Sequence, residues 1–162
     1  DADAVIYATP VYQMGISGQL KCAIDRLGHV IFSSSERTLP RLMKVGGVIA
    51  QGNCRQGGQE TAMLQIIQHL LTMNCIPVPG DTPNSYIGAG GVVANLQKGG
   101  IVEDEVGMSA ARSVGKRVAE VAKILKVGRE TLKGQLPSEY VWRHPPLRHD
   151  GRSCNSEVLH SE

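Results

Sequence analysis

The stretch AVIYATPVYQMG occupies residues 4–15 and opens with a nearly continuous apolar run, 4–8, that includes β-branched residues. Such a run, without polar alternation, is typical of a strand buried on both faces in a parallel sheet. A turn-rich segment follows, and Ser17 is the predicted N-cap of a helix whose apolar residues recur at helical spacing, at positions 20, 23, 24 and 27. The stretch therefore predicts a strand, a loop and a helix in succession.

The same order recurs downstream. Residues 44–50 predict a second buried strand, followed by a loop over 51–58 and a helix over about 60–73. Residues 75–79 predict a third strand, and its two prolines favour a short or edge strand. A last helix begins near Asp104 and is expected to end at Gly128. Alternating strands and helices predict an α/β fold with parallel strands and right-handed crossovers.

Three loops are expected where these strands end: 9–16, 51–58 and 79–91, all rich in Gly, Pro or amide side chains. Ligands of parallel sheets bind at the carboxyl ends of the strands. In the first loop, Pro10 stiffens the turn, Gly15 admits close approach, and Tyr12 is placed to lie against a planar heterocycle. The alternative is an ordinary turn with a packed tyrosine. Neither a GxGxxG nor a GxxxxGK[ST] motif occurs in the first two loops.

The bulk composition narrows the function classes. The chain has 162 residues, 41% of them hydrophobic, which suits one globular domain. A net charge of +2 and only six aromatic residues argue against a nucleic-acid partner. No apolar run approaches the roughly 20 residues of a membrane helix. The four cysteines form no CxxC pair, so we expect reduced thiols in the cytoplasm and no metal site.

The loops also carry a resemblance. The segment 3–12, then Gly15, 17–21 and 24–26, resembles the third strand, flavin loop and helix of the NADPH-dependent FMN reductase and iron–sulfur flavoprotein families. The motif at 57–61 resembles the segment after their fourth strand and is similar to tryptophan-repressor-binding-protein-type NAD(P)H:quinone oxidoreductases. Residues 85–90 resemble a weaker Tyr-Gly-Ala segment after the fifth strand. The match runs from residue 1 to about 126.

This resemblance implies a flavodoxin-like, doubly wound parallel sheet of order 2-1-3-4-5, of which the chain supplies strands 3–5 and their helices. It also implies that FMN is the cofactor and NAD(P)H the electron donor. The flavin does the redox chemistry, so no catalytic residue is assigned. The residues implied to contact the flavin are Thr9, Pro10, Val11, Tyr12, Gln13, Met14, Gly15, Gly52, Asn53, Cys54, Arg55, Gly57, Gly58 and Tyr86.

The chain departs from the family at its start. Nothing in it matches the Ser/Thr-rich loop that binds the FMN phosphate, and it begins at the family's third strand. Roughly 70 residues, two strands and their helices, would then be absent. We therefore expect residues 1–133 to be the C-terminal part of a flavodoxin-like domain with an apolar edge, and 134–162 an extended tail. An iron–sulfur cluster is possible only if a preceding segment supplies it.

The leading hypothesis is an FMN-dependent NAD(P)H oxidoreductase that reduces quinones or similar small acceptors, as a homodimer or homotetramer. The alternatives are a flavin electron carrier, with or without an iron–sulfur cluster, and a scaffold protein that lost its flavin. Cys54 is a minor candidate for a redox thiol. His69 is expected on a helix surface or subunit interface, and Asp25 in a local ion pair. The histidines and arginines beyond residue 142 suit a solvated tail or an oligomer contact better than a metal or NADPH site.

Overall fold

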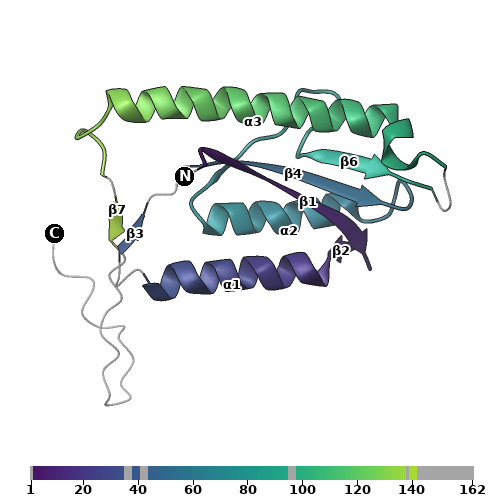
Figure 1. The fold of residues 1–162 in the computed structure, drawn as a ribbon, viewed down its shortest axis with the longest axis horizontal. Helices are drawn as coiled ribbons and strands as arrows, with labels where there is room; N and C mark the ends of the chain where they lie inside the picture. Colours follow the sequence, from purple (N-terminus) through teal and green to yellow (C-terminus); the bar gives the residue numbers. More distant parts are fainter. Residues whose placement is uncertain (1, 35–37, 41–43, 95–97, 138, 142–162) are drawn as a thin grey trace, which may run out of the picture.

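The described part of the chain is built around a central sheet with helices on both faces (Figure 1). The computed structural model describes residues 2–34, 38–40, 44–94, 98–137 and 139–141. Helices α1 and α2 lie on one face of the sheet and α3 lies on the other. The elements are β1 (Ala4–Tyr12), β2 (Gly15–Ile16), α1 (Gly18–Ser34), β3 (Thr38–Pro40), β4 (Val45–Gly52), α2 (Gln59–Thr72), β5 (Ile76–Pro77), β6 (Ala89–Val92), the 3₁₀ helix η1 (Gly100–Glu103), α3 (Glu105–Thr131) and β7 (Glu139–Val141).

Strand β4 is the centre of the sheet. It runs parallel to β1, in a register from Ala4↔Val45 to Pro10↔Gln51. On its other side β4 pairs in parallel with β5 and then with β6. Because β5 and β6 pair with successive parts of β4, they are two pieces of one edge strand. The parallel arrangement of β1, β4 and the β5–β6 edge strand confirms the α/β, flavodoxin-like sheet expected of this part of the fold.

The first loop is shorter than expected. Strand β1 continues through Thr9, Pro10, Val11 and Tyr12, and β2 pairs with it antiparallel at Val11↔Ile16. Only residues 13 and 14 form the turn, with φ of 49° and 66°. Positive φ at both central residues is the geometry of a tight type I′ hairpin, whose twist matches its strands. The prediction of a loop from residue 9 was therefore wrong, since β-branched and aromatic residues extend the strand.

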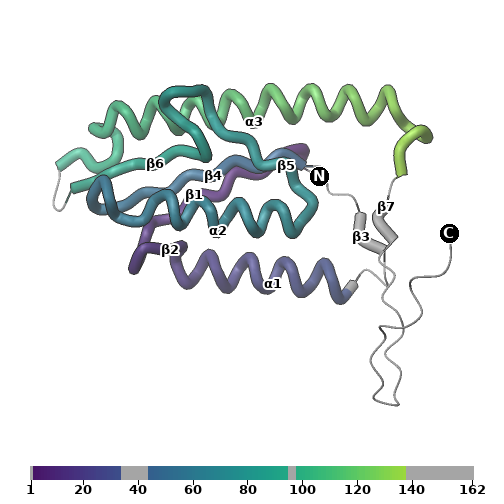
Figure 2. The backbone as a smooth tube through the Cα atoms, turned by 180° about the vertical axis from the view of Figure 1, so that it is seen from behind, coloured from purple at the N-terminus to yellow at the C-terminus, as the bar shows by residue number. Residues whose placement is uncertain are grey.

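The prediction of a loop over 79–91 at the carboxyl end of the sheet was also wrong. Residues 78–88 interrupt the edge strand between β5 and β6, and Figure 2 shows this excursion rising beside α3. The buried Ser85 hydroxyl closes it, accepting from Gly80 N at 3.0 Å and donating to the Gly88 carbonyl at 2.6 Å. The connection at the carboxyl end instead begins after Val92. The short, proline-containing β5 agrees with the expected edge position.

The helix starts follow the sequence better than the helix ends. Ser17 caps α1 as expected, since its Oγ accepts from Leu20 N at 3.3 Å. Asp104 caps α3 by accepting from Gly107 N at 2.9 Å. The expectation that α3 ends at Gly128 was wrong, because the helix continues to Thr131. A glycine inside a helix costs only about 1 kcal/mol, so it does not by itself stop one.

Two apolar cores flank β4, one under each helix layer. The α3 side contains Val45, Ala89, Ala110, Val114, Val118 and Ala122. The α2 side contains Val48, Ala50, Ala62, Met63, Ile66 and Leu70. Successive glycines of β4 let both helices approach. A Cβ at Gly46 would lie 2.5 Å from Leu70 Cδ1, and one at Gly47 would lie 2.7 Å from Val118 Cγ2.

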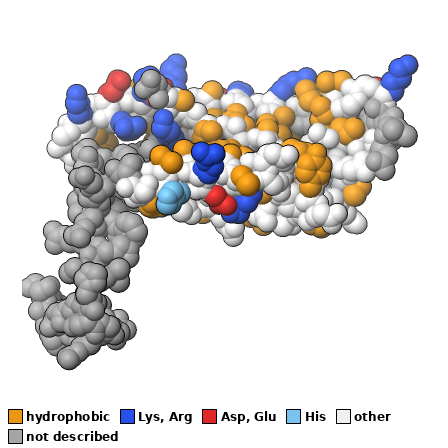
Figure 3. All heavy atoms as spheres, turned by 60° about the horizontal axis from the view of Figure 1, so that its bottom comes forward, with side chains coloured by type: hydrophobic (Ala, Val, Ile, Leu, Met, Phe, Trp, Pro, Cys, Tyr) orange, Lys and Arg blue, Asp and Glu red, His pale blue; other side chains and the backbone are white. Residues whose placement is uncertain are grey.

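Part of the apolar surface is open. In the described part of the chain, no strand pairs with the outer edge of β1 over residues 4–10, as expected for a sheet with an exposed apolar edge. Ile6 on this edge is 41% exposed, and Leu27 and Val30 of α1 are exposed as well. Figure 3 shows hydrophobic side chains scattered over the underside of the molecule. Among the described helices, none is both long and apolar enough to cross a membrane.

Residues 139–141, near the start of the expected tail, form strand β7. β7 pairs antiparallel with β3, from Thr38↔Val141 to Pro40↔Glu139. The ion pair between Lys126 Nζ and Asp3 Oδ2, at 3.0 Å, also joins α3 to the start of β1. This pair lowers the pKa of Asp3. The tail histidines at 144, 149 and 160, and the arginines at 143, 148 and 152, lie outside the described residues.

His69, which was expected on a helix surface or at a subunit interface, is half-buried. Its Nε2 lies 3.3 Å from the Tyr7 hydroxyl, and the two rings meet edge to face with centroids 5.5 Å apart. Burial lowers the pKa of His69 and raises that of Tyr7. The His69 side chain therefore links α2 to β1.

We expect this contact to make stability depend on pH. Because the folded-state pKa of His69 lies below its ordinary value of 6.5, the unfolded chain binds the proton more readily. Stability that is fully present above pH 6.5 is then lost as the pH falls below that value. Urea unfolding from pH 7.5 to 5 should show this slope, and His69→Gln should reduce it. The control His29→Gln, at an exposed position of α1, should keep the slope; an unchanged slope in His69→Gln would contradict the assignment.

The α2 core gives a second prediction. Ile66 is fully buried against β4, whereas Leu64 on the same helix is 50% exposed. Ile66→Ala should lower the free energy of unfolding by about 2–5 kcal/mol, because a buried side chain is lost and a cavity remains. Leu64→Ala should cost far less. Chemical denaturation of both variants tests this, and equal losses would show that α2 does not pack as described.

Candidate functional site

The carboxyl ends of β1, β4 and β6 enclose a hollow of about 360 Å³, named here the β1 hollow. Its lining includes Thr9 and Pro10 from β1, Gln51 from β4 and Gly91 from β6. Ile101 and Met108 close it from the side of α3. No residue of this lining carries a titratable side chain. The hollow offers apolar surface, backbone and one amide, which suits a flat, largely apolar ligand.

Thr9 fixes the wall that β1 contributes. Its side chain is only 4% exposed. The Oγ1 atom accepts from Ser17 N at 3.2 Å and donates to the Pro10 carbonyl at 2.9 Å. Because Ser17 also caps α1, this one hydroxyl ties together the strand, the hairpin and the helix. Sequence reasoning gave Thr9 a role toward the flavin, and the structure adds a structural role inside the protein.

The hairpin tip touches the second loop, a contact that the sequence did not predict. A Cβ at Gly58 would lie 2.6 Å from Met14 Cα, and Gly58 has a φ of 97°, so only glycine fits this contact. Gln65 of α2 fixes the hairpin from below, since its Oε1 accepts from Ile16 N at 3.0 Å. Tyr12 and Met14 remain 62% and 55% exposed. The hairpin tip therefore leaves the Tyr12 and Met14 side chains exposed at the edge of the site.

The second loop presents backbone donors. In the described part of the chain, the N–H groups of Asn53, Cys54 and Arg55 take part in no hydrogen bond, whereas Gly57 N donates to the Cys54 carbonyl at 3.2 Å. Gly52 and Gly58 are buried and Gly57 is half-buried, while residues 53–55 are exposed. Residues 53–55 do not line the β1 hollow itself; their unpaired N–H groups follow the carboxyl end of β4 and suit a ring with carbonyl and ring-nitrogen acceptors.

Gln59 is the residue that sequence reasoning missed. It is 3% exposed, and its Nε2 donates to the Cys54 carbonyl at 2.6 Å and to the Gly91 carbonyl at 3.3 Å. Its Oε1 accepts from Gly57 N at 3.1 Å. One buried amide therefore joins the second loop to β6. Its place beside the Gly57–Gly58 pair was the available signal, but the sequence does not show that a glutamine at a helix start turns inward.

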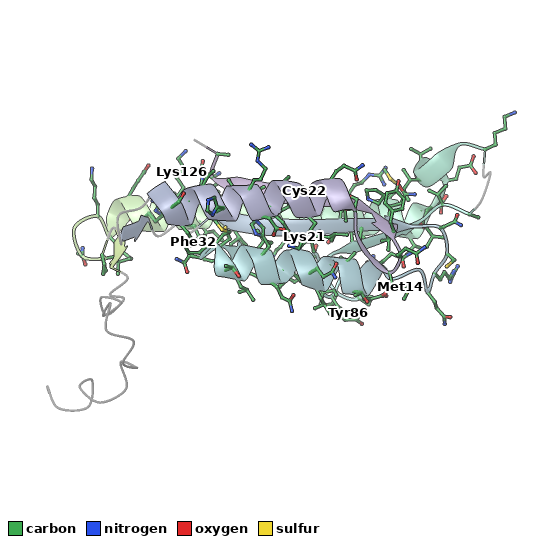
Figure 4. All side chains as sticks on the ribbon, turned by 90° about the horizontal axis from the view of Figure 1, so that it is seen from below. Met14, Lys21, Cys22, Phe32, Tyr86 and Lys126 are labelled. Atoms are coloured by element: carbon green, nitrogen blue, oxygen red, sulfur yellow. The ribbon has the colours of Figure 1, made fainter. Side chains whose placement is uncertain are left out.

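Tyr86 lies apart from these loops. It belongs to the excursion between β5 and β6 and is 69% exposed. Figure 4 shows Met14 at the end of α2 and Tyr86 farther along that helix. The structure places Thr9 and Pro10 in the β1 hollow and Met14 against Gly58, and contact of these residues or of Tyr86 with a flavin stays a prediction.

Of the thiols and the carboxylate singled out from the sequence, only Cys54 belongs to the two loops. Cys54 is an exposed free thiol. Cys75 is a free thiol whose pKa burial raises, so it is a weak nucleophile. Asp25 is held by Lys21 at 2.5 Å, the local ion pair that the sequence predicted. Within the described ranges, no three His, Cys, Asp or Glu residues are grouped to hold a metal ion.

The fold and this site define a flavodoxin-like α/β protein. The WrbA-like flavodoxin of Agrobacterium tumefaciens has the same fold, with a TM-score of 0.53 at 23% identity over 75% of this chain and 67% of that one. The chain belongs to the NADPH-dependent FMN reductase family, whose model matches residues 1–87.

Two curated relatives extend the comparison. An iron–sulfur flavoprotein of Methanocaldococcus jannaschii is 38% identical over 126 residues, 78% of this chain and 62% of that protein. An NAD(P)H dehydrogenase (quinone) of Archaeoglobus fulgidus is 32% identical over 125 residues, 77% of this chain and 62% of that protein. The chain thus spans about three fifths of the length of each.

The buried amide gives a prediction for the site. Gln59→Leu should lower the free energy of unfolding by about 1–3 kcal/mol, because Cys54 O, Gly91 O and Gly57 N lose their partner. It should also speed amide hydrogen exchange at Gly57. The control Gln56→Leu changes an exposed amide of the same loop, which should leave both measurements nearly unchanged. Equal effects of the two substitutions would remove the assigned role of Gln59.

Proposed function

We propose that the chain is part of an FMN-dependent NAD(P)H oxidoreductase that reduces quinones or similar small acceptors. The observation that carries the proposal is the contact of the Gln13–Met14 turn with Gly58 beside a hollow without titratable side chains. Membership of the NADPH-dependent FMN reductase family and the quinone-reducing relative of Archaeoglobus fulgidus support it.

The donor set of the site fits FMN. The free N–H groups of residues 53–55 match the carbonyl and nitrogen acceptors of an isoalloxazine, and Tyr12 and Met14 supply apolar surface at its rim. Residues of the first two loops, from Thr9 to Gly15 and from Gly52 to Gly58, would hold the ring. Bound there, the flavin supplies hydride and electron transfer.

The chain's own residues then have positioning roles. Thr9 fixes the hairpin to the start of α1, and Gln59 fixes the second loop to β6, so each wall that would contact the ring is held in place. The apolar residues Ile101 and Met108 keep water from the floor of the hollow. The exposed hairpin tip leaves one side of the site open to a small acceptor.

The first experiment is the visible spectrum of the purified full-length protein and of its heat-released supernatant. Released FMN without residual colour, followed by quinone reduction with NADH or NADPH, is the expected result. No turnover with either nucleotide would overturn the proposed activity. A colourless protein that does not take up added FMN would favour the flavin-free scaffold.

A second candidate is an electron-transfer flavoprotein. The 38% identity to an iron–sulfur flavoprotein favours it. Of the described cysteines, Cys22 lies in α1, Cys54 in the loop after β4 and Cys75 in the loop before β5, so a cluster would need ligands from elsewhere. A broad brown absorbance that stays with the heated protein, and reduction by ferredoxin and not by NAD(P)H, would support this candidate.

Assembly and location complete the proposal. A homodimer or homotetramer would cover the apolar surface that α1 exposes at Leu27 and Val30. Free thiols at Cys22, Cys54 and Cys75 suit a reducing cytoplasm.

A further inference from the structure

A second cleft, of about 370 Å³, lies on the side of β4 away from β1 and is named here the Arg55 cleft. Arg55, Gln59 and Glu60 line it from the second loop and the first turn of α2. Val92, Asp104 and Val106 line it from the end of β6 and the start of α3. No residue assigned to the flavin lines it except Arg55.

The cleft contains two unpaired opposite charges. Arg55 and Glu60 are exposed and form no ion pair with each other or with another described residue. The other polar side chains are already used. Asp104 accepts from Val92 N at 2.7 Å and from Gly107 N at 2.9 Å, and the Gln59 amide is fully engaged. A ligand would therefore meet one free guanidinium and one free carboxylate.

These two groups match a ribose that carries phosphate. A guanidinium binds phosphate oxygens with charge-assisted hydrogen bonds, and a carboxylate accepts from the hydroxyls of a ribose. Val92 and the 71% exposed Val106 offer apolar surface for a base. The start of α2 also lacks a side-chain cap, so its positive end adds to the attraction for an anion.

The position of the cleft connects it to the flavin site. Gly107 lines both the Arg55 cleft and the β1 hollow, and a Cβ there would lie 3.0 Å from Gly91 Cα. The two cavities are therefore neighbours, with the loop of Arg55 between the hairpin and the cleft. A two-part ligand can place one end at the hollow and the other in the cleft.

We propose that the Arg55 cleft binds the adenosine phosphate end of the pyridine nucleotide, with Arg55 on phosphate and Glu60 on the ribose hydroxyls. This inference rests on the proposed NAD(P)H oxidoreductase function and assigns the place where the reductant is recognised. Glu60 favours a free 2′-hydroxyl and Arg55 a 2′-phosphate, so the choice between NADH and NADPH depends on these two side chains.

Calorimetric titration of the full-length protein with 5′-ADP and with 2′,5′-ADP tests the site without flavin turnover. At least one nucleotide should bind, and Arg55→Gln should weaken it by about tenfold or more. Glu60→Gln should weaken 5′-ADP and strengthen 2′,5′-ADP. Tighter 5′-ADP supports the site and assigns NADH; tighter 2′,5′-ADP supports it and assigns NADPH. The control Arg117→Gln removes an exposed positive charge from α3 and should change neither affinity.

The inference is overturned if neither nucleotide binds at millimolar concentration, or if Arg55→Gln binds as tightly as the unchanged protein. These outcomes are distinct from failure of the proposed function. Turnover with NAD(P)H together with unaffected Arg55→Gln kinetics would reject the cleft and keep the enzyme. Nucleotide binding that depends on Arg55, without any turnover, would keep the cleft and reject the enzyme.

Discussion

The parallel pairing of β1 with β4 is the constraint on which the rest of the molecule depends. Parallel neighbours need a crossover, and α1 lies within it, so both strands end at the same edge of the sheet. This alone brings the hairpin and the second loop together. The pairing requires helices on both faces of β4, and Gly46 and Gly47 give Leu70 and Val118 the space to pack there. The β1 hollow is thus a product of backbone register, and its walls are set before any side chain contributes.

Much of this arrangement follows from local sequence. Buried parallel strands are nearly continuous apolar runs, so β1 and β4 are visible in the sequence, and Ser17 and Asp104 signal helix starts because their oxygens accept from the first turn. The second loop could be recognised at Gly57 and Gly58 because its turn chemistry is local. The hairpin could not, because its positive-φ residues are Gln13 and Met14 and not the glycine or asparagine that usually marks such a turn.

Other features depend on contacts far apart in the sequence. The split of the edge strand is held by Ser85 within the excursion and by Ser113 of α3, which accepts from Asp81 N at 2.5 Å, and no short window of sequence contains that pair. The inward turn of Gln59 likewise depends on the Gly91 carbonyl, 32 residues away. Composition and periodicity identify elements, whereas these bonds decide how loops meet. That is why the glycines of the second loop could be recognised in the sequence and the residue that fixes this loop could not.

The distribution of charge separates two tasks at the carboxyl edge. The β1 hollow has no ionisable lining, so a redox ring held there would be tuned by backbone N–H groups and by exclusion of water. The charged groups Arg55 and Glu60 are exposed and line the neighbouring Arg55 cleft, where a polar ligand can meet them. The loop over 53–58 contributes Arg55 to the Arg55 cleft and meets the hairpin turn at Gly58, so a ligand that orders this loop in the cleft also acts on the hairpin. Occupancy of the two sites should therefore be coupled through this loop, with Gln59 as the buried anchor that limits how far the loop can shift.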